Sequence, residues 1–334
     1  MDPLKDEGPS LAGERPSGIE ALPSRVERYG KAKGRALDVA EHIASTPDSP
    51  WTGAKRDRLE RCGDYLLFRH YLSQDALKLH AAQFCRYHLL CPLCAIRRGA
   101  KALEAYLPRY EVVKASAPLL RPLLVTLTVK DGPDLLERFK HLKRSVQALN
   151  KRRSGKGSGG SAWCNVEAAV WSYEVKRGSG SGLWHPHAHA FVLAGGEVVQ
   201  ADLRREWREI TKDSFMVDVR PIVGDVADGF CEVFKYAVKF SDMELADTVH
   251  AATVLQGRRL IASCGLFYGV EIPEDLTDAP LEGPYVELLY RFLAGKGYGF
   301  VGSKEGVHTP LPEGDRTPQA HDWPRYWRQL RAAA

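Results

Sequence analysis

The sequence has no apolar run that approaches the roughly 20 residues needed to span a bilayer. The first residues, Met1 to Glu7, also lack the apolar core of a signal peptide. No G-x-x-x-x-G-K-[ST] motif occurs, so the sequence contains no evident ATP-driven motor. The net charge of +5 is only mildly basic and does not by itself indicate a nucleic-acid partner. We therefore expect a cytoplasmic protein without membrane contact.

Cysteine is sparse, and its distribution is uneven. There are seven cysteines, and thiols stay reduced in the cytoplasm, which favours metal binding over disulfides. A group of four has the C-x2-C spacing of a zinc knuckle and predicts a closed, tetrahedral, structural site. The four are Cys62, Cys85, Cys91 and Cys94. His80 or His88 could replace one of them, and four buried unpaired thiols are the alternative. We expect Cys164, Cys231 and Cys264, which lie in apolar contexts, to be core residues.

At 334 residues the chain can form one main domain with accessory segments. Residues 1–50 are rich in proline, glycine, serine and charge, and we expect a flexible N-terminal arm with one helix around 25–43. The cysteine-rich segment occupies residues 51–100. The main domain covers 101–270, and a C-terminal extension covers 271–334.

The main domain alternates between helix and strand patterns. Helices are predicted near 97–114, from Pro133 onward, near 200–212 and around Tyr236. Strands are predicted at 123–129, 164–176, 186–194 and 215–221, and the second and third are joined by a glycine- and serine-rich turn. This order predicts an α+β fold in which helices cover a central antiparallel sheet.

Three histidines fall within five residues, in His185-Pro186-His187-Ala188-His189. In a strand, His187 and His189 point to the same face with Cα atoms roughly 7 Å apart, so both imidazoles can bind one metal ion. Glu174 on the preceding strand could complete the ligand set. Two imidazoles and one carboxylate leave positions open for phosphate oxygens and suit Mg²⁺ or Mn²⁺. The alternative is that the histidines are hydrogen-bonded structural residues and Glu174 is solvated.

Tyr236 lies in a helical pattern with charged neighbours. Glu232 is one turn earlier on the same face, while Lys235 and Lys239 flank the tyrosine. Lysines near a phenol favour its phenolate and can hold a phosphate. Without the histidines, an amphipathic helix with solvated charges would explain the pattern equally well.

Taken together, three ordered motifs resemble those of the replication initiators of rolling-circle plasmids, within the HUH endonuclease superfamily. The motifs are Leu124–Lys130, Trp184–His189 and Glu232–Lys239. The segment from Cys85 to Cys94 also resembles a cysteine-rich stretch of these proteins. The resemblance covers roughly residues 60–260 and is of the single-tyrosine type, because neither position 232 nor position 240 is a tyrosine. Ala188 departs from the usual pattern, in which a bulkier residue is common.

The resemblance implies an origin-binding nuclease domain over 101–270 and a role for each motif residue. Tyr236 would attack a single-stranded phosphodiester at the plasmid origin, giving a 5′-phosphotyrosine and a 3′-OH that primes synthesis. His187 and His189 would hold the divalent ion, with Glu174 as third ligand and His185 as a weaker candidate for ligand or substrate contact. Glu232 would act as general base for a water that cleaves the strand at termination.

The implied partners are origin DNA and a host helicase, DNA polymerase and single-strand-binding protein. Basic residues between Arg138 and Lys156 are expected to contact phosphates, and a dimer is among the options for the oligomeric state. Two alternatives stay open. One is a relaxase or transposase of the same superfamily. The other is a non-catalytic, zinc-stabilised DNA-binding regulator in which the histidines are structural.

Overall fold

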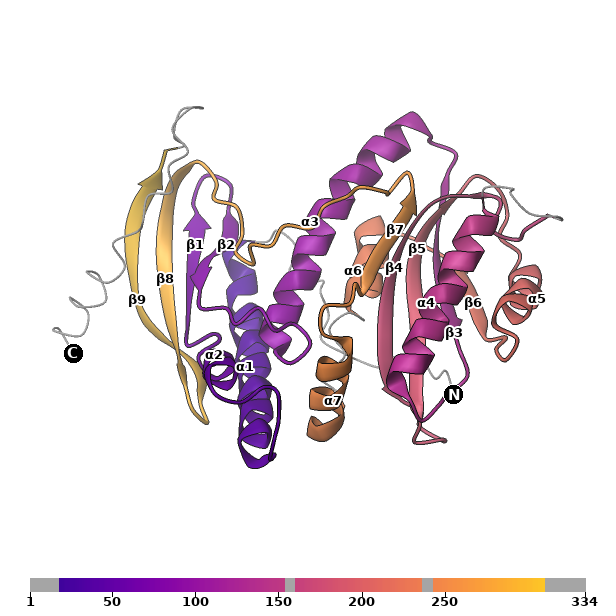
Figure 1. Ribbon diagram of the computed structural model, residues 1–334. Coiled ribbons are helices and arrows are strands. Elements are labelled where there is room, and N and C mark those ends of the chain that lie inside the picture. Colours follow the sequence, from indigo (N-terminus) through magenta and orange to yellow (C-terminus); the bar gives the residue numbers. More distant parts are fainter. Residues whose placement is uncertain (1–17, 154–159, 236–242, 310–334) are drawn as a thin grey trace.

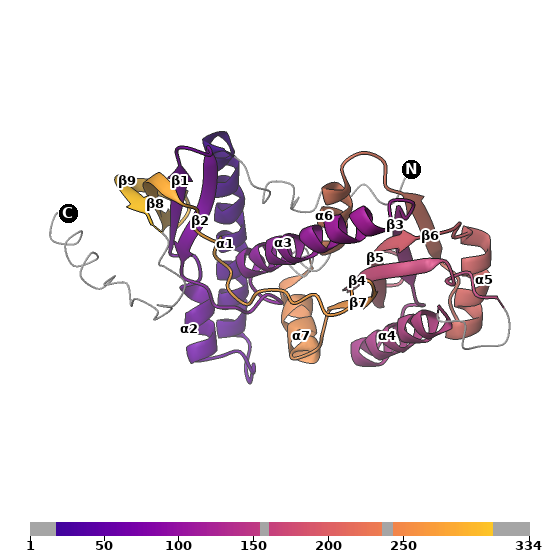
Figure 2. The ribbon, with the colours of Figure 1, turned by 90° about the horizontal axis from the view of Figure 1, so that it is seen from above.

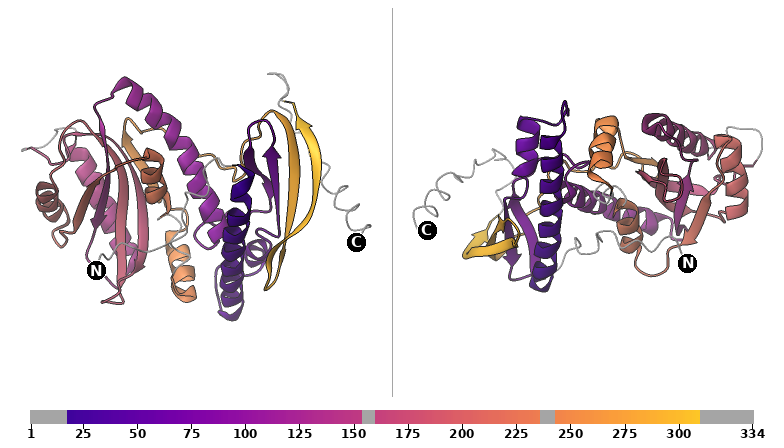
Figure 3. Two further views of the ribbon diagram at one scale, coloured as in Figure 1. Left: turned by 180° about the vertical axis from the view of Figure 1, so that it is seen from behind. Right: turned by 90° about the horizontal axis from the view of Figure 1, so that it is seen from below.

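The computed structural model describes residues 18–153, 160–235 and 243–309. Two lobes, each built around an antiparallel sheet, stand on either side of the long helix α3 (Pro92–Ser116), as Figure 1 shows from the front and Figure 3 from behind and below. Within the described residues, every helix is too short or too polar to cross a membrane.

The first lobe contains a five-stranded sheet in the order β6-β3-β5-β4-β7. Its strands are β3 (Arg121–Thr128), β4 (Val166–Arg177), β5 (Trp184–Ala194), β6 (Val217–Pro221) and β7 (Ile261–Gly265). All pairings are antiparallel, and β5 at the centre is buried along almost its whole length. The predicted α+β class with a central antiparallel sheet is therefore confirmed. The edge strand β7 was not predicted.

Helices cover both faces of this sheet. On one face, α4 (Leu135–Arg152) buries its apolar stripe, and Phe139 packs against Tyr173 of β4 with ring centroids 6.0 Å apart. The helix begins two residues after Pro133, because the Asp134 side chain accepts a hydrogen bond from the Glu137 amide and caps it. The helix α5 (Gln200–Thr211) packs beside α4.

The opposite face is covered by α3 and α6 (Val226–Lys235). Phe230 of α6 stacks on Phe191 of β5 with a centroid separation of 3.9 Å, and Tyr110 of α3 contacts both rings. Because side chains alternate along a strand, Phe191 shares its face with His187 and His189. The histidines therefore lie on the face that α6 covers.

The second lobe contains a four-stranded sheet in the order β2-β1-β8-β9, which the sequence did not predict. Its strands are β1 (Tyr65–Tyr71), β2 (Ala76–Ala82), β8 (Gly283–Leu293) and β9 (Gly297–His308). One face packs on α1 (Leu22–Ser45), where Tyr29 stacks on Phe68 of β1 at 6.3 Å. Shorter helices are η2 (Ile19–Ala21), α2 (Ala54–Glu60) and α7 (Leu245–Leu255).

This lobe changes the predicted boundaries at both ends of the chain. The helix predicted around 25–43 is confirmed as α1 (Leu22–Ser45), but it does not belong to a flexible arm, because its Tyr29, Ala36 and Ile43 are fully buried. The described part of the expected C-terminal extension supplies β8, which pairs with β1 of the cysteine-rich segment, and β9, which pairs with β8. The composition of α1 was misleading because its buried Arg25 and Lys33 are paired with acids and carbonyl oxygens.

Candidate functional site

The histidine strand and its neighbour bring three potential metal ligands together. Glu174 of β4 is paired with His187 of β5, and Ser172 is paired with His189. The Nε2 atoms of His187 and His189 lie 3.0 and 3.6 Å from the Glu174 Oε2 atom. All three side chains are buried, and their ligand atoms lie within 4.8 Å of one another. The structure therefore places these three predicted residues in one cluster.

Neighbouring groups orient the two imidazole rings. Thr126 of β3 is paired with His189, and its Oγ1 lies 3.0 Å from Nδ1 of that ring. Nδ1 of His187 lies 3.4 Å from the carbonyl oxygen of His185. In each ring Nδ1 therefore faces a neighbouring oxygen atom, while Nε2 points toward Glu174. This arrangement is typical of metal-binding histidines, whose second nitrogen is held by a neighbouring group.

The electrostatics of the cluster favour an ionised carboxylate. Burial alone would raise the pKa of Glu174, but the charges and hydrogen bonds of His187 and His189 outweigh it and hold this pKa well below its usual range. Two nitrogen donors and one anionic oxygen form a mixed donor set that suits a divalent ion. The residues present therefore fit a bound Mg²⁺ or Mn²⁺.

His185 is engaged differently from the other two histidines. Its Nδ1 lies 2.5 Å from Oδ1 of Asp131, which also accepts a hydrogen bond from the Ser181 hydroxyl. Burial lowers the pKa of His185, against the opposing effect of Asp131. The His185 ring is 5.4 Å from that of His187, but the cluster of converging ligand atoms contains only Glu174, His187 and His189. Asp131 was missed, since no local pattern links it to a histidine 54 residues away.

Part of the third motif reaches the same place. Glu232 of α6 lines a small pocket together with Thr126 and His189. Its carboxylate also forms an ion pair with Lys235, with Oε2 and Nζ 2.6 Å apart. Tyr236 and Lys239, predicted as nucleophile and phosphate contact, lie outside the described residues.

The four predicted zinc-site cysteines also come together. The Sγ atom of Cys62 lies 3.5 Å from that of Cys94 and 3.4 Å from that of Cys91, and Cys85 is 3.6 Å from Cys94. These separations are far too long for disulfides. They approach the value of about 3.8 Å expected for sulfurs around tetrahedral zinc with Zn–S bonds of about 2.3 Å. Neither His80 nor His88 is needed to complete the set.

The surroundings of the cysteines also suit a bound cation. The backbone amides of Cys85, Arg86 and Tyr87 point at sulfurs of the cluster, at 3.4, 3.3 and 3.5 Å. Such N–H donors stabilise thiolates, and thiolates bind zinc.

The remaining cysteines were expected in the core. Cys231 is buried and Cys264 is half-buried, but Cys164 is exposed because it lies in the turn before β4.

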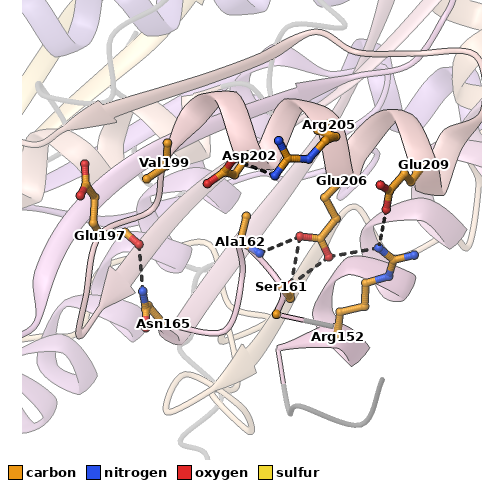
Figure 4. Close-up of a pocket in the computed structure, with 11 residues that line it drawn as sticks. Arg152, Ser161, Ala162, Asn165, Glu197, Val199, Asp202, Arg205, Glu206 and Glu209 are labelled. Carbon is orange, nitrogen blue, oxygen red and sulfur yellow. Dashed lines mark hydrogen bonds and ion pairs between the residues drawn. The ribbon is translucent and has the colours of Figure 1, made fainter. Parts of the chain in front are cut away.

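A large hollow at the other end of the five-stranded sheet contains none of the predicted catalytic or metal-binding residues (Figure 4). Its buried carboxylate, Glu206, accepts hydrogen bonds from the Ser161 hydroxyl and the Ala162 amide, both at 2.8 Å, and pairs with Arg152. Arg138 is likewise paired with Glu137 and Asp213. These two arginines, expected to contact DNA phosphates, are thus engaged within the protein.

Comparison with known proteins identifies the family. A family model described as "Replication protein" matches residues 76–282, so the chain belongs to this family of replication proteins. A "Protein rep" of Bacillus amyloliquefaciens is 25% identical over 287 residues, covering 74% of this chain and 82% of the relative. One from a Bacillus species is 25% identical, covering 72% and 88%. One from Streptococcus pneumoniae serotype 2 is 28% identical, covering 63% and 69%. No solved structure matches the chain.

The matched range contains Glu174, His187, His189 and Glu232, and three of the four clustered cysteines. Membership of this family supports a role as a plasmid replication initiator that binds DNA.

Proposed function

We propose that this protein is a metal-dependent, site-specific nickase and strand transferase that starts rolling-circle replication of a plasmid. The observation that carries the proposal is the convergence of three sequence-distant motifs. Thr126 of the first, His189 of the second and Glu232 of the third line one small pocket. A regulator with structural histidines would not require an ionised, buried carboxylate, here Glu174, that faces two imidazole rings.

In the proposed nicking step, the Tyr236 oxygen attacks the scissile phosphorus. The phenol loses its proton, a tyrosine O–P bond forms and the P–O3′ bond breaks, and the released O3′ takes up a proton in its place to become the priming 3′-OH. The cluster of Glu174, His187 and His189 would hold a Mg²⁺ or Mn²⁺ ion, which supplies Lewis-acid stabilisation of the phosphate oxygens when bound. Lys235 and Lys239 would contribute positive charge beside the phosphate and the phenolate.

At termination, we assign Glu232 the role of general base for a water molecule. Glu232 lines the same small pocket as His189, which supports this role. A hydrolytic second cut needs no second tyrosine, which agrees with the single tyrosine of this motif.

A covalent adduct provides the direct test. Purified protein is incubated with single-stranded origin oligonucleotides and Mn²⁺, and a denaturing gel is used to detect protein–DNA adducts. We expect an adduct with the wild type, none with Tyr236→Phe, and an undiminished one with the control Tyr65→Phe. His187→Ala and His189→Ala should also abolish the adduct while the protein stays folded.

Other outcomes favour the competing functions. DNA binding without any adduct supports the zinc-stabilised regulator and contradicts the proposal. An adduct formed only with a transfer origin or a transposon end supports a relaxase or transposase.

A further inference from the structure

A second polar hollow lies on the histidine face of the five-stranded sheet, between α3 and the segment 258–274, which contains β7. We call it the α3–β7 groove. It encloses about 640 Å³, and its lining includes Arg98, Tyr106, Arg258, Arg259 and Tyr268. Figures 1 and 2 show the chain after β7 running beside α3 on its way to the second lobe. No role has yet been assigned to these residues.

The strand register brings one end of the groove toward the metal-ligand cluster. Ile261 of β7 is paired with Ser172 of β4, and the carbonyl of Leu260 accepts a hydrogen bond of 2.9 Å from the Tyr173 amide. Paired strand residues share a face, and so do residues two apart. Ile261, Ser172 and Glu174 therefore lie on one face, and the chain at Arg259 approaches the level of Glu174.

The charge of the groove is mainly positive at that end. Among the described residues, neither Arg258 nor Arg259 forms an ion pair with an acidic side chain, and Arg258 is held by a bond to the Val254 carbonyl. Their positive charges act on a neighbouring lysine. Burial lowers the pKa of Lys143, and the charges of Arg259 and Arg258 lower it further. Two acidic residues, Glu271 and Glu274, also line the groove, and Glu274 lies toward its other end, where it lines the smaller hollow beside Cys94.

The groove continues along α3 toward the cysteine cluster. A smaller hollow of about 270 Å³ shares His88, Arg98 and Glu274 with it and adds Arg86. Arg98 is fixed by hydrogen bonds to the carbonyl oxygens of Ile272 and Pro273, at 3.4 and 2.7 Å. The two hollows share three lining residues and therefore adjoin each other along α3.

An exposed aromatic side chain lies on this path. Tyr268 is 76% exposed, although it follows the fully buried Phe267. The Tyr268 amide donates a hydrogen bond to the Gly265 carbonyl, and the Tyr268 carbonyl accepts one from the Arg109 guanidinium. The backbone turn that carries the ring is therefore fixed. Arginines along a groove with an exposed aromatic ring are the features that bind single-stranded nucleic acid, by phosphate contacts and base stacking.

We propose that the α3–β7 groove holds the single-stranded DNA adjoining the scissile phosphate, with Arg258 and Arg259 on phosphates and Tyr268 stacked on a base. The proposal rests on the proposed nickase function and identifies where its substrate strand lies. A single strand fits better than a duplex, because the stacking surface needs an unpaired base.

The test measures binding separately from cleavage. Every protein carries Tyr236→Phe, so no covalent capture occurs, and affinity for a fluorescent single-stranded origin oligonucleotide is measured by anisotropy at several salt concentrations. Each lost phosphate contact should reduce the slope of log K against log salt concentration by about 0.7. We expect R258Q/R259Q to reduce the slope by about 1.4, whereas the matched control R204Q/R205Q on the exposed face of α5 leaves it unchanged.

The aromatic contact is tested in the same assay. Tyr268→Ala should weaken binding on the order of tenfold without changing the salt slope, and Tyr268→Phe should retain most of the affinity. Photocrosslinking of an iodouracil-substituted strand, followed by mass spectrometry, should identify a peptide containing Tyr268.

A salt slope of R258Q/R259Q equal to that of R204Q/R205Q would overturn the groove assignment, and so would equal affinity for duplex and single strand. If R258Q/R259Q unfolds at a lower temperature, R258K/R259K provides a charge-preserving pair that should restore the slope. The two proposals fail separately. An adduct from wild type with an unchanged slope contradicts only the groove, whereas a reduced slope without any adduct contradicts only the nickase.

Discussion

At the scale of single residues, the most informative contact is that between Thr126 and His189. The threonine hydroxyl meets Nδ1 of the ring at 3.0 Å and so helps to direct Nε2 into the ligand cluster. The first motif alone did not reveal that Thr126 orients a histidine, because a threonine in a strand commonly has only a packing role. The strand register, which pairs Thr126 with His189, is what reveals it.

We predict that Thr126→Val weakens Mn²⁺ binding about 10- to 100-fold, as expected when the group that orients a metal-binding histidine is lost. The change nearly preserves volume and keeps the β-branched side chain. Calorimetry with Mn²⁺ measures the effect, and Thr128→Val, two residues along the same strand face and paired with His187, is the matched control. Equal losses in both variants would contradict a specific role for Thr126.

For Glu232 we predict a separation of the two cleavage events. Glu232→Ala should still form the Tyr236 adduct, while strands released from a replicating plasmid accumulate as multimers, because no base activates the terminating water. Gel analysis of single-stranded products distinguishes the outcomes. Normal monomeric circles from the variant would refute the role assigned to this carboxylate.

Sequence reasoning at this scale was accurate where residues are linked by strand periodicity or a short turn. His187, His189 and Glu174 lie on two strands joined by a turn, so their proximity followed from alternation. The engagement of His185 by Asp131 could not be foreseen in the same way. It depends on how the chain after β3 passes the start of β5, where Gly132 bridges to Trp184.

At the scale of elements, α3 links the cysteine cluster to the helix of the third motif. The helix begins directly after Cys91 and includes Cys94, while Tyr106, further along, packs on Phe234 of α6 at 5.5 Å. A metal ion bound by the cysteines would fix the first turn of α3 and, through this helix, the surface against which α6 packs.

We predict that Cys91→Ser lowers the zinc content and the thermal midpoint of the protein, since three sulfurs no longer close a tetrahedral site. Elemental analysis and calorimetry measure the two effects. Cys164→Ser, which changes an exposed thiol in a turn, should alter neither. Unchanged metal content in Cys91→Ser would remove the zinc site.

The segment between the lobes is held by a buried acid, Asp278. It pairs with Arg25 of α1 and Arg97 of α3, and its Oδ2 accepts a 2.6 Å hydrogen bond from the Leu79 amide. Burial opposes ionisation, but the two arginines prevail and hold the pKa of Asp278 well below its usual range. The carboxylate thus joins two helices, a strand and the segment that follows β7.

A depressed carboxyl pKa stabilises the folded state above the unfolded pKa of about 3.9, and this contribution is lost as the pH falls below that value. We predict that wild-type stability declines below about pH 4 and that Asp278→Asn flattens this decline. The variant should also lose about 3–5 kcal/mol at neutral pH, because two buried arginines lose their partner. Urea unfolding across the pH range measures both effects, with Asp275→Asn as the exposed control; an unchanged acid limb would contradict the assignment.

At the scale of the whole molecule, the sequence predicted the lobe with the histidines far better than the other. The first lobe is mostly built from neighbouring elements, such as the β4–β5 hairpin, whose patterns can be interpreted locally. The second lobe joins β1 to β8, which are more than 200 residues apart, for example where Leu67 pairs with Leu289. The sequence predicts its N-terminal helix around 25–43 but not the packing of that helix on the second sheet, because the surrounding residues are rich in proline, glycine, serine and charge.

We predict that a chain ending at residue 282 is poorly soluble, whereas one ending at 309, which retains β8 and β9, is monomeric and cooperatively folded. The shorter chain lacks β8 and β9, so β1 becomes an edge strand with its backbone groups unpaired and with apolar side chains such as Leu67 uncovered. Size-exclusion chromatography of the two chains compares them. A monomeric, cooperatively folded shorter chain would contradict this account of the second lobe.

The pairing of β1 with β8 has a consequence for synthesis on the ribosome. All the histidines, cysteines and carboxylates discussed above are translated before β8. A nascent polypeptide therefore carries these groups while the four-stranded sheet of the second lobe contains only β1 and β2. Because the four-stranded sheet is completed only when β8 and β9 emerge, termination before β8 yields a product in which β1 has an unpaired edge, which chaperones and proteases recognise. The order of elements along the chain thereby delays completion of the second lobe until β8 and β9 have been translated.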